Sequence, residues 1–182
     1  MRSTTVAPEQ VEAPAETWSG QSVPRKEDRR LLQGQGVFVD DIKRHVMGYL
    51  HFVRSPYAHA HISSIDVSQA MAMPGVYGTL TGEEVAAVTD PFFQIASVPG
   101  ANVKDYALAL GKVRYVGEPV VAVVAETREA ARDASELVEV EYEPLEAVTD
   151  ARRAQDADTP VIHDDAGGNL MWHGVYEWGD LD

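Results

Sequence analysis

The sequence predicts an α+β domain in which a mixed β-sheet is flanked by short helices. Three observations in the second half of the chain indicate this class. Residues 120–124 form an unbroken apolar run, which is typical of a strand covered on both faces. Thr127 is a suitable N-cap, and apolar residues then recur as far as Val138 with the spacing of an amphipathic helix. Over residues 138–143 the period becomes two, because glutamates alternate with apolar side chains as in a half-buried strand.

The first half of the chain predicts short extended segments. Residues 37–39 form a brief extended piece that ends in a turn at Asp40 and Asp41. Two runs rich in β-branched and aromatic residues, 49–53 and 61–67, are expected to be strands.

Helices and one further strand are expected between residues 68 and 88. Ser68 is expected to cap a short helix that stops before Pro74, and residues 76–80 alternate as in a strand. Thr81 and Glu84 have the spacing of a capping box, which predicts a helix over 82–88. The segment 89–111, interrupted by prolines and glycine, is expected to be a loop.

Composition excludes several classes of function. The chain has 182 residues, 45% of them hydrophobic, and its 15 basic and 29 acidic residues give a net charge of −14. An acidic balance of this size disfavours nucleic acid and anionic membranes as partners. The chain has no cysteine, so it can form no disulfide, thiolate metal site or iron–sulfur ligation of its own. Because no apolar run approaches the roughly 20 residues of a spanning helix, and no apolar leader follows Arg2, we expect a cytoplasmic protein.

Charge and order are unevenly distributed along the chain. Residues 1–24 hold three prolines and few large apolar side chains, so we expect a flexible N-terminal tail. Residues 25–54 carry seven basic and four acidic side chains, whereas residues 126–158 carry four basic and eleven acidic ones. This asymmetry indicates either two solvated faces or a bipolar surface that orients the domain in a larger complex.

The residues contain no complete catalytic constellation. His59 and His61 would share one face of a strand and could supply two metal ligands, but no third ligand is evident, so structural or surface histidines are the alternative. The stretch His163–Asp165 indicates either a weak site for a hard cation or a solvated loop. Gly34 and Gly36 form only half of a nucleotide-binding fingerprint, and a tight entry into the first strand explains them better. The sequence alone thus predicts a domain that is part of something larger.

Taken in order, five segments resemble the large subunits of molybdenum hydroxylases, the group of aldehyde oxidase, xanthine dehydrogenase and aerobic carbon monoxide dehydrogenase. The segments are GQGVFVDDI (34–42), RSPYAHAHI (54–62), PGV (74–76), VRYVGEPV with AVVA (113–125) and LVEVEYEPL (137–145). The part that they resemble is the N-terminal α/β hammerhead domain, which we expect over residues 25–182. The resemblance implies that the molybdopterin-binding domains of the large subunit would follow.

The same resemblance implies a function within a complex. Such enzymes oxidise aldehydes, N-heteroaromatic carbons or carbon monoxide with water as the oxygen source. Molybdopterin lies in the parent subunit, and iron–sulfur clusters and FAD lie in partner subunits. Because the family's cofactor-binding loops and catalytic glutamate lie downstream of this domain, no catalytic, cofactor-binding or metal residue is assigned here, and the isolated chain is expected to be inactive.

Four residues are predicted to lie at an interface with the remaining molybdopterin-binding domains or with the iron–sulfur and flavin subunits. They are Arg54, His59, Gly117 and Glu118, since polar groups in tight turns often contact partners. The alternative is that they satisfy only local hydrogen bonds. Two other functions stay open: a stand-alone, non-catalytic interaction module that retains the hammerhead fold, and an independent hydrolase that uses carboxylates or a metal at His59 and His61.

Overall fold

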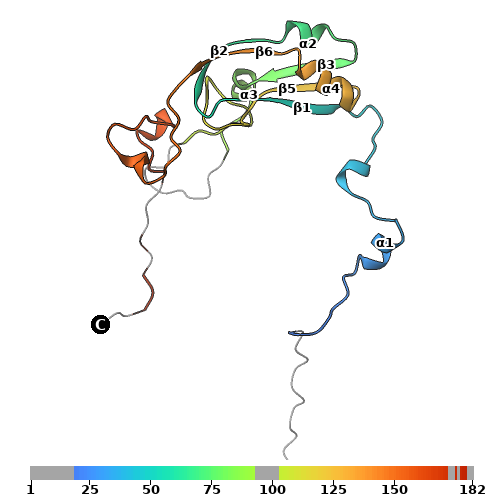
Figure 1. Ribbon diagram of the computed structural model, residues 1–182. Helices are drawn as coiled ribbons and strands as arrows, with labels where there is room; N and C mark the ends of the chain where they lie inside the picture. Colours follow the sequence, from blue (N-terminus) through green and yellow to red (C-terminus); the bar gives the residue numbers. More distant parts are fainter. Residues whose placement is uncertain (1–18, 93–102, 172–174, 176, 180–182) are drawn as a thin grey trace, which may run out of the picture. The chain divides into compact units, whose positions relative to one another are not determined.

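The computed structural model describes residues 19–92, 103–171, 175 and 177–179. The chain divides into two compact units, Met1–Arg44 and His45–Asp182. The first unit contains helix α1 (Asp28–Leu32) and the 3-10 turn η1 (Val39–Asp41). The backbone N–H of Phe38 donates to Asp41 Oδ2 at 3.0 Å, so the predicted turn at Asp40 and Asp41 is confirmed. The strands belong to the second unit (Figure 1).

The described strands form two antiparallel sheets of three strands each. One sheet has the order β1 (Tyr49–Arg54), β5 (Pro119–Ala125), β3 (Val76–Thr81), and the other has the order β4 (Lys112–Val113), β2 (Ala60–Asp66), β6 (Glu139–Pro144). The α+β class is confirmed, but two antiparallel sheets replace the single mixed sheet that the sequence predicted. The reason is that β5 and β6, which flank a helix in the sequence, belong to different sheets, so that helix does not connect parallel neighbours.

Local side-chain caps begin two of the helices where the sequence predicted them. Helix α3 (Gly82–Val88) starts with the predicted capping box, in which Thr81 N–H donates to Glu84 Oε2 at 2.7 Å and Glu84 N–H donates to Thr81 Oγ1 at 3.4 Å. Helix α4 (Arg128–Ser135) starts with Ala130 N–H donating to Thr127 Oγ1 at 3.0 Å.

Helix α2 (Ser68–Ala72) corrects one detail of the sequence analysis. Its N-cap is Val67, and the side chain of Asp66 accepts the backbone N–H of Ser68 at 2.8 Å. Ser68 is therefore the first helical residue rather than the cap. Two 3-10 turns, η2 (Arg153–Gln155) and η3 (Asp164–Ala166), follow the last strand.

Residues of both sheets and of helices α2 and α4 form the hydrophobic core. Val121 and Val123 of β5 are fully buried and pack with Val113 of β4 and Ala134 of α4. Val140 and Tyr142 of β6 are partly buried against this cluster. Within the part of the chain that the structure describes, no helix combines the length and the apolar character that crossing a membrane requires.

Candidate functional site

Two turns are hydrogen-bonded to each other at one end of the β1–β5–β3 sheet. Gly117 N–H donates to Ser55 O at 2.8 Å, and Ser55 N–H donates to Glu118 O at 2.9 Å. The guanidinium of Arg54 donates through Nη1 to Gly117 O at 2.8 Å. Gly117 has φ +88°, a conformation that side chains with a Cβ rarely adopt. Arg54, Gly117 and Glu118, three of the four predicted interface residues, thus belong to one network.

A buried carboxylate holds the second of these turns together. Glu118 is only 8% exposed, and its Oε2 accepts a hydrogen bond from the backbone N–H of Arg114. Arg114 Nη1 lies 3.9 Å from Glu118 Oε1 and donates to Lys112 O at 3.0 Å. Burial raises the pKa of Glu118, and the N–H group and positive charge of Arg114 oppose this rise. The carboxylate therefore acts as an internal acceptor for the turn.

The fourth predicted residue, His59, joins a different pair of segments. Its Nδ1 donates to Glu146 O at 2.7 Å, and Leu145 N–H donates to His59 O at 2.9 Å. These bonds hold the start of β2 to the residues that follow β6. His59 is 5% exposed, and its Nε2 has no hydrogen-bond partner among the described residues.

Among the described residues, the structure shows no third ligand for a metal ion at His59 and His61. His59 is buried just before β2, whereas His61 is exposed within β2, opposite Glu143 and Lys112. Among the residues that the structure describes, no three or more His, Cys, Asp or Glu side chains come close enough together to hold a metal ion.

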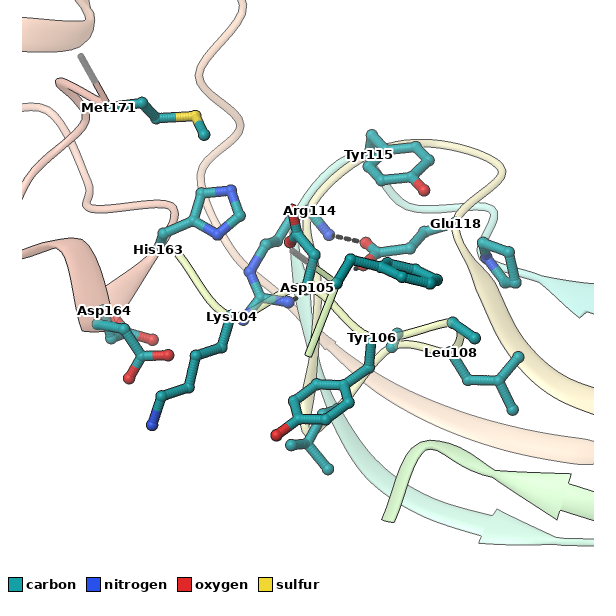
Figure 2. Close-up of a pocket in the computed structure, with 16 residues that line it drawn as sticks. Lys104, Asp105, Tyr106, Leu108, Arg114, Tyr115, Glu118, His163, Asp164 and Met171 are labelled. Atoms are coloured by element: carbon teal, nitrogen blue, oxygen red, sulfur yellow. Dashed lines mark hydrogen bonds and ion pairs between the residues drawn. The ribbon is translucent and has the colours of Figure 1, made fainter. Parts of the chain in front are cut away.

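A pocket of about 780 Å³ lies beside the Arg114–Glu118 pair. Figure 2 shows Arg114 and Glu118 on one side of it, with His163 and Asp164 on the segment opposite. Burial lowers the pKa of His163, and the positive charges of Arg114 and Lys112 lower it further. The pocket wall therefore favours a neutral imidazole.

Asp164 is the counter-ion of a buried lysine. Lys112 Nζ lies 2.8 Å from Asp164 Oδ2, and the lysine side chain is 7% exposed while that of Asp164 is 73% exposed. The hydrogen bond from Lys112 lowers the pKa of Asp164. In the stretch His163–Asp165, which the sequence left open between a cation site and a solvated loop, one carboxylate is therefore engaged by a protein cation.

Sequence reasoning missed Lys112 and Arg114. The one signal that could have indicated them is their position a few residues before the long apolar strand β5, because cations that become buried require partners. Each has a carboxylate: Glu118 for Arg114 and Asp164 for Lys112. The pair of Lys112 in β4 with Asp164 in η3 connects segments that lie apart in the sequence, and Arg114 faces Glu118 across the turn before β5.

Comparison with known proteins identifies the fold of this chain. Residues 33–146 match the family model described as "Aldehyde oxidase and xanthine dehydrogenase, a/b hammerhead domain". The chain is 43% identical over 166 residues to the nicotine 6-hydroxylase large subunit of Paenarthrobacter nicotinovorans, covering 90% of this chain and 20% of that protein. It is 41% identical over 164 residues to the carbon monoxide dehydrogenase large chain of Afipia carboxidovorans, covering 89% and 20%.

A solved structure gives the same result. Quinoline 2-oxidoreductase from Pseudomonas putida 86 superposes with a TM-score of 0.73 at 41% identity, covering 80% of this chain and 18% of that one. The chain spans about a fifth of the length of the curated relatives that it matches.

Proposed function

Because the chain belongs to the family of aldehyde oxidase and xanthine dehydrogenase hammerhead domains, we propose that it is the N-terminal structural portion of a molybdopterin-dependent hydroxylase. The family match over 33–146 is the observation that carries this proposal. The enzyme would oxidise an aldehyde, an N-heteroaromatic compound or carbon monoxide with water as the oxygen source. The chain itself would hold no catalytic residue and would support the remaining molybdopterin-binding domains.

We propose that the described residues do not themselves form the molybdopterin site. A pterin phosphate needs cations or N–H donors that are not already committed. Here the buried cations have partners, since Arg114 bonds Lys112 O and faces Glu118, and Lys112 pairs with Asp164. We therefore place the cofactor in the rest of the large subunit, and the iron–sulfur clusters and FAD in partner subunits.

The predicted interface residues have two proposed roles. His59, Gly117 and Glu118 use their described polar contacts inside the domain, so we propose that they act by holding the turns in position. Arg54 is exposed and is the one of the four that we propose to contact a partner directly.

Gly117 offers a test that separates assembly from chemistry. Gly117→Val imposes an unfavourable φ, and for an L-residue the left-handed region costs about 1–2 kcal/mol, with β-branched residues worst. Gly117→Asn is the matched control, because asparagine tolerates this region. Both variants are made in the tagged native complex, and assembled enzyme, bound molybdenum and turnover per molybdenum are measured with aldehyde, N-heteroaromatic and carbon monoxide substrates.

A scaffold role predicts that Gly117→Val lowers the yield of assembled enzyme while turnover per molybdenum stays unchanged, and that Gly117→Asn yields nearly as much as the parent. A Gly117→Val complex that assembles fully but loses turnover selectively would contradict the proposal. A chain that purifies alone and without molybdenum would favour the stand-alone interaction module.

A further inference from the structure

The sheet β1–β5–β3 carries apolar side chains on both of its faces. One face, with Val53, Val121 and Val123, packs into the core. Because side chains opposite one another in an antiparallel pair share a face, Leu50 lies with Val124, and Phe52 and Leu80 lie with Ala122, on the other side. We call this second side the open face.

Tyr77 also belongs to the open face. A Cβ built on Gly48 would lie 2.9 Å from Val124 Cγ1 and 3.5 Å from Tyr77 Cδ2, so these two side chains border the same spot. Leu50, Tyr77 and Leu80 are 52%, 54% and 46% exposed. The other described residues of the unit 45–182 therefore leave large apolar side chains of β1 and β3 about half exposed on either side of β5, whose own Ala122 is only 6% exposed on this face.

The second sheet of the same unit provides an internal comparison. In β6, Val140 and Tyr142 point to the core, while Glu139, Glu141 and Glu143 are exposed. Opposite them, Ser64 of β2 is exposed and donates to Glu141 Oε2 at 2.9 Å. In that sheet, apolar side chains that face the core alternate with exposed polar ones, as expected of an antiparallel sheet with one solvent-exposed face. The open face breaks this pattern, which indicates that it is covered in the complete protein.

Arg54 marks one end of the open face. Its guanidinium lies 5.4 Å from the centroid of the Phe52 ring and donates to Gly117 O. An apolar centre with a cation at its edge is the usual composition of a protein interface. A second copy of this chain is a poor occupant, because each copy carries a net charge of −14 and the two would repel each other.

We propose that the open face is the docking surface for the remaining part of the large subunit, which contacts Leu50, Phe52, Tyr77 and Leu80 with apolar side chains and Arg54 with an acceptor. The length of the relatives supports the choice of occupant, since the match covers only 20% of each of the two curated large subunits. This inference rests on the proposed function, and it adds which surface of the domain makes the contact.

Site-specific photo-crosslinking in the complete native complex tests this surface. Tyr77→p-benzoylphenylalanine keeps the aromatic ring of an exposed side chain and adds a benzoyl group, and Leu80→p-benzoylphenylalanine is a second probe on the same face. Glu141→p-benzoylphenylalanine, on the polar face of the other sheet, is the matched control. The complex is purified by a tag on this chain, irradiated and digested, and the crosslinked peptides are identified by mass spectrometry alongside molybdenum analysis.

We expect probes at positions 77 and 80 to crosslink to large-subunit residues outside 1–182. The control probe at position 141 should not give these crosslinks. Crosslinks from the open face to residues 19–44, to a second copy or to another subunit, or no crosslink at all, would overturn the inference. If the complex contains molybdenum but the open face crosslinks elsewhere, only the docking surface is wrong. If the complex contains neither molybdenum nor further large-subunit domains, the proposed function fails.

Discussion

A methyl group added at Gly82 tests how the segment around Ala109 packs against the N-terminus of helix α3. Gly82 is buried at the start of α3, and a Cβ there would lie 2.0 Å from Ala109 O and 2.8 Å from Ala109 C. Both atoms are backbone, so no side-chain rotation relieves the overlap. Ala109 is itself held in place, because its N–H donates to Pro119 O at 2.8 Å at the start of β5. Gly82→Ala must therefore displace the loop or the helix.

The size of the effect follows from three contributions. Forcing an extra methyl into a packed site destabilises by about 1–3 kcal/mol. Losing the hydrogen bond from Ala109 to Pro119 adds about 1 kcal/mol. The better helix propensity of alanine offsets at most about 1 kcal/mol. We expect the free energy of unfolding to fall by about 2–3 kcal/mol, which for a chain of this size lowers Tm by roughly 5–10 °C.

Gly78→Ala is the matched control. Gly78 lies in the neighbouring strand β3, where a Cβ would meet nothing within 4 Å, and its φ is not in the left-handed region. Replacing a strand glycine with alanine is favourable by about 0.5–1 kcal/mol, so this variant should unfold at or slightly above the parent temperature. Thermal unfolding followed by circular dichroism compares the three proteins. Equal Tm values for Gly82→Ala and the parent would refute the packing argument.

Three further predictions concern the buried polar groups. His59→Leu leaves Glu146 O without its donor and should lower the free energy of unfolding, measured by urea denaturation, by about 1–3 kcal/mol. His59→Asn should lose less stability, because its amide N–H can replace Nδ1 as the donor. Equal losses of stability in the two variants would argue against the hydrogen bond. Burial raises the pKa of Glu118, so the native state binds the proton of this carboxyl more tightly than the unfolded state does. The free energy of unfolding of the parent, relative to that of Glu118→Gln, should therefore fall as pH rises above 4.5. An advantage of the parent that grows with pH would contradict this prediction. Asp164→Asn removes the counter-ion of buried Lys112 and should destabilise by about 1 kcal/mol at pH 7 after allowance for the exposure of Asp164. Because the pKa of Asp164 is lowered, this difference should persist down to pH 3.8 and vanish as pH falls through the lowered value; a difference independent of pH would exclude the ion pair as its cause.

The features that could be predicted from the sequence are those that depend on interactions between residues close together in the chain. The capping box joins Thr81 to Glu84 and the other cap joins Thr127 to Ala130, so both interactions span three residues, and both helices begin where predicted. The alternation of glutamate and apolar residues in β6 placed Val140 and Tyr142 toward the core in the same way.

What depends on distant residues could not be predicted in this way. The separation into two sheets follows from β5 pairing with β1 and β3, which lie far back in the chain. The partner of buried Lys112 is Asp164, and no local pattern links the two. The short helix Asp28–Leu32 and the strand Lys112–Val113 also escaped prediction, because neither is long enough to show a period.

The apolar run of residues 120–124 lies at the centre of the sheet that carries the open face. It predicted a strand covered on both faces, and in the described part of the unit 45–182 Val121 and Val123 are fully buried on one face while Ala122 is 6% exposed on the other. On the other side Leu50 and Leu80 remain exposed next to Ala122 and Val124. The proposed docking of the remaining large subunit would complete the second cover.

Recovery of this polypeptide from its native host, with a tag before Met1, tests the central claim most directly. The preparation is analysed for intact mass, co-purifying chains, molybdenum and iron. A scaffold of a molybdenum hydroxylase predicts a longer chain or associated subunits, together with both metals. A lone 182-residue chain without molybdenum would contradict the proposed function and show that the fold serves another purpose.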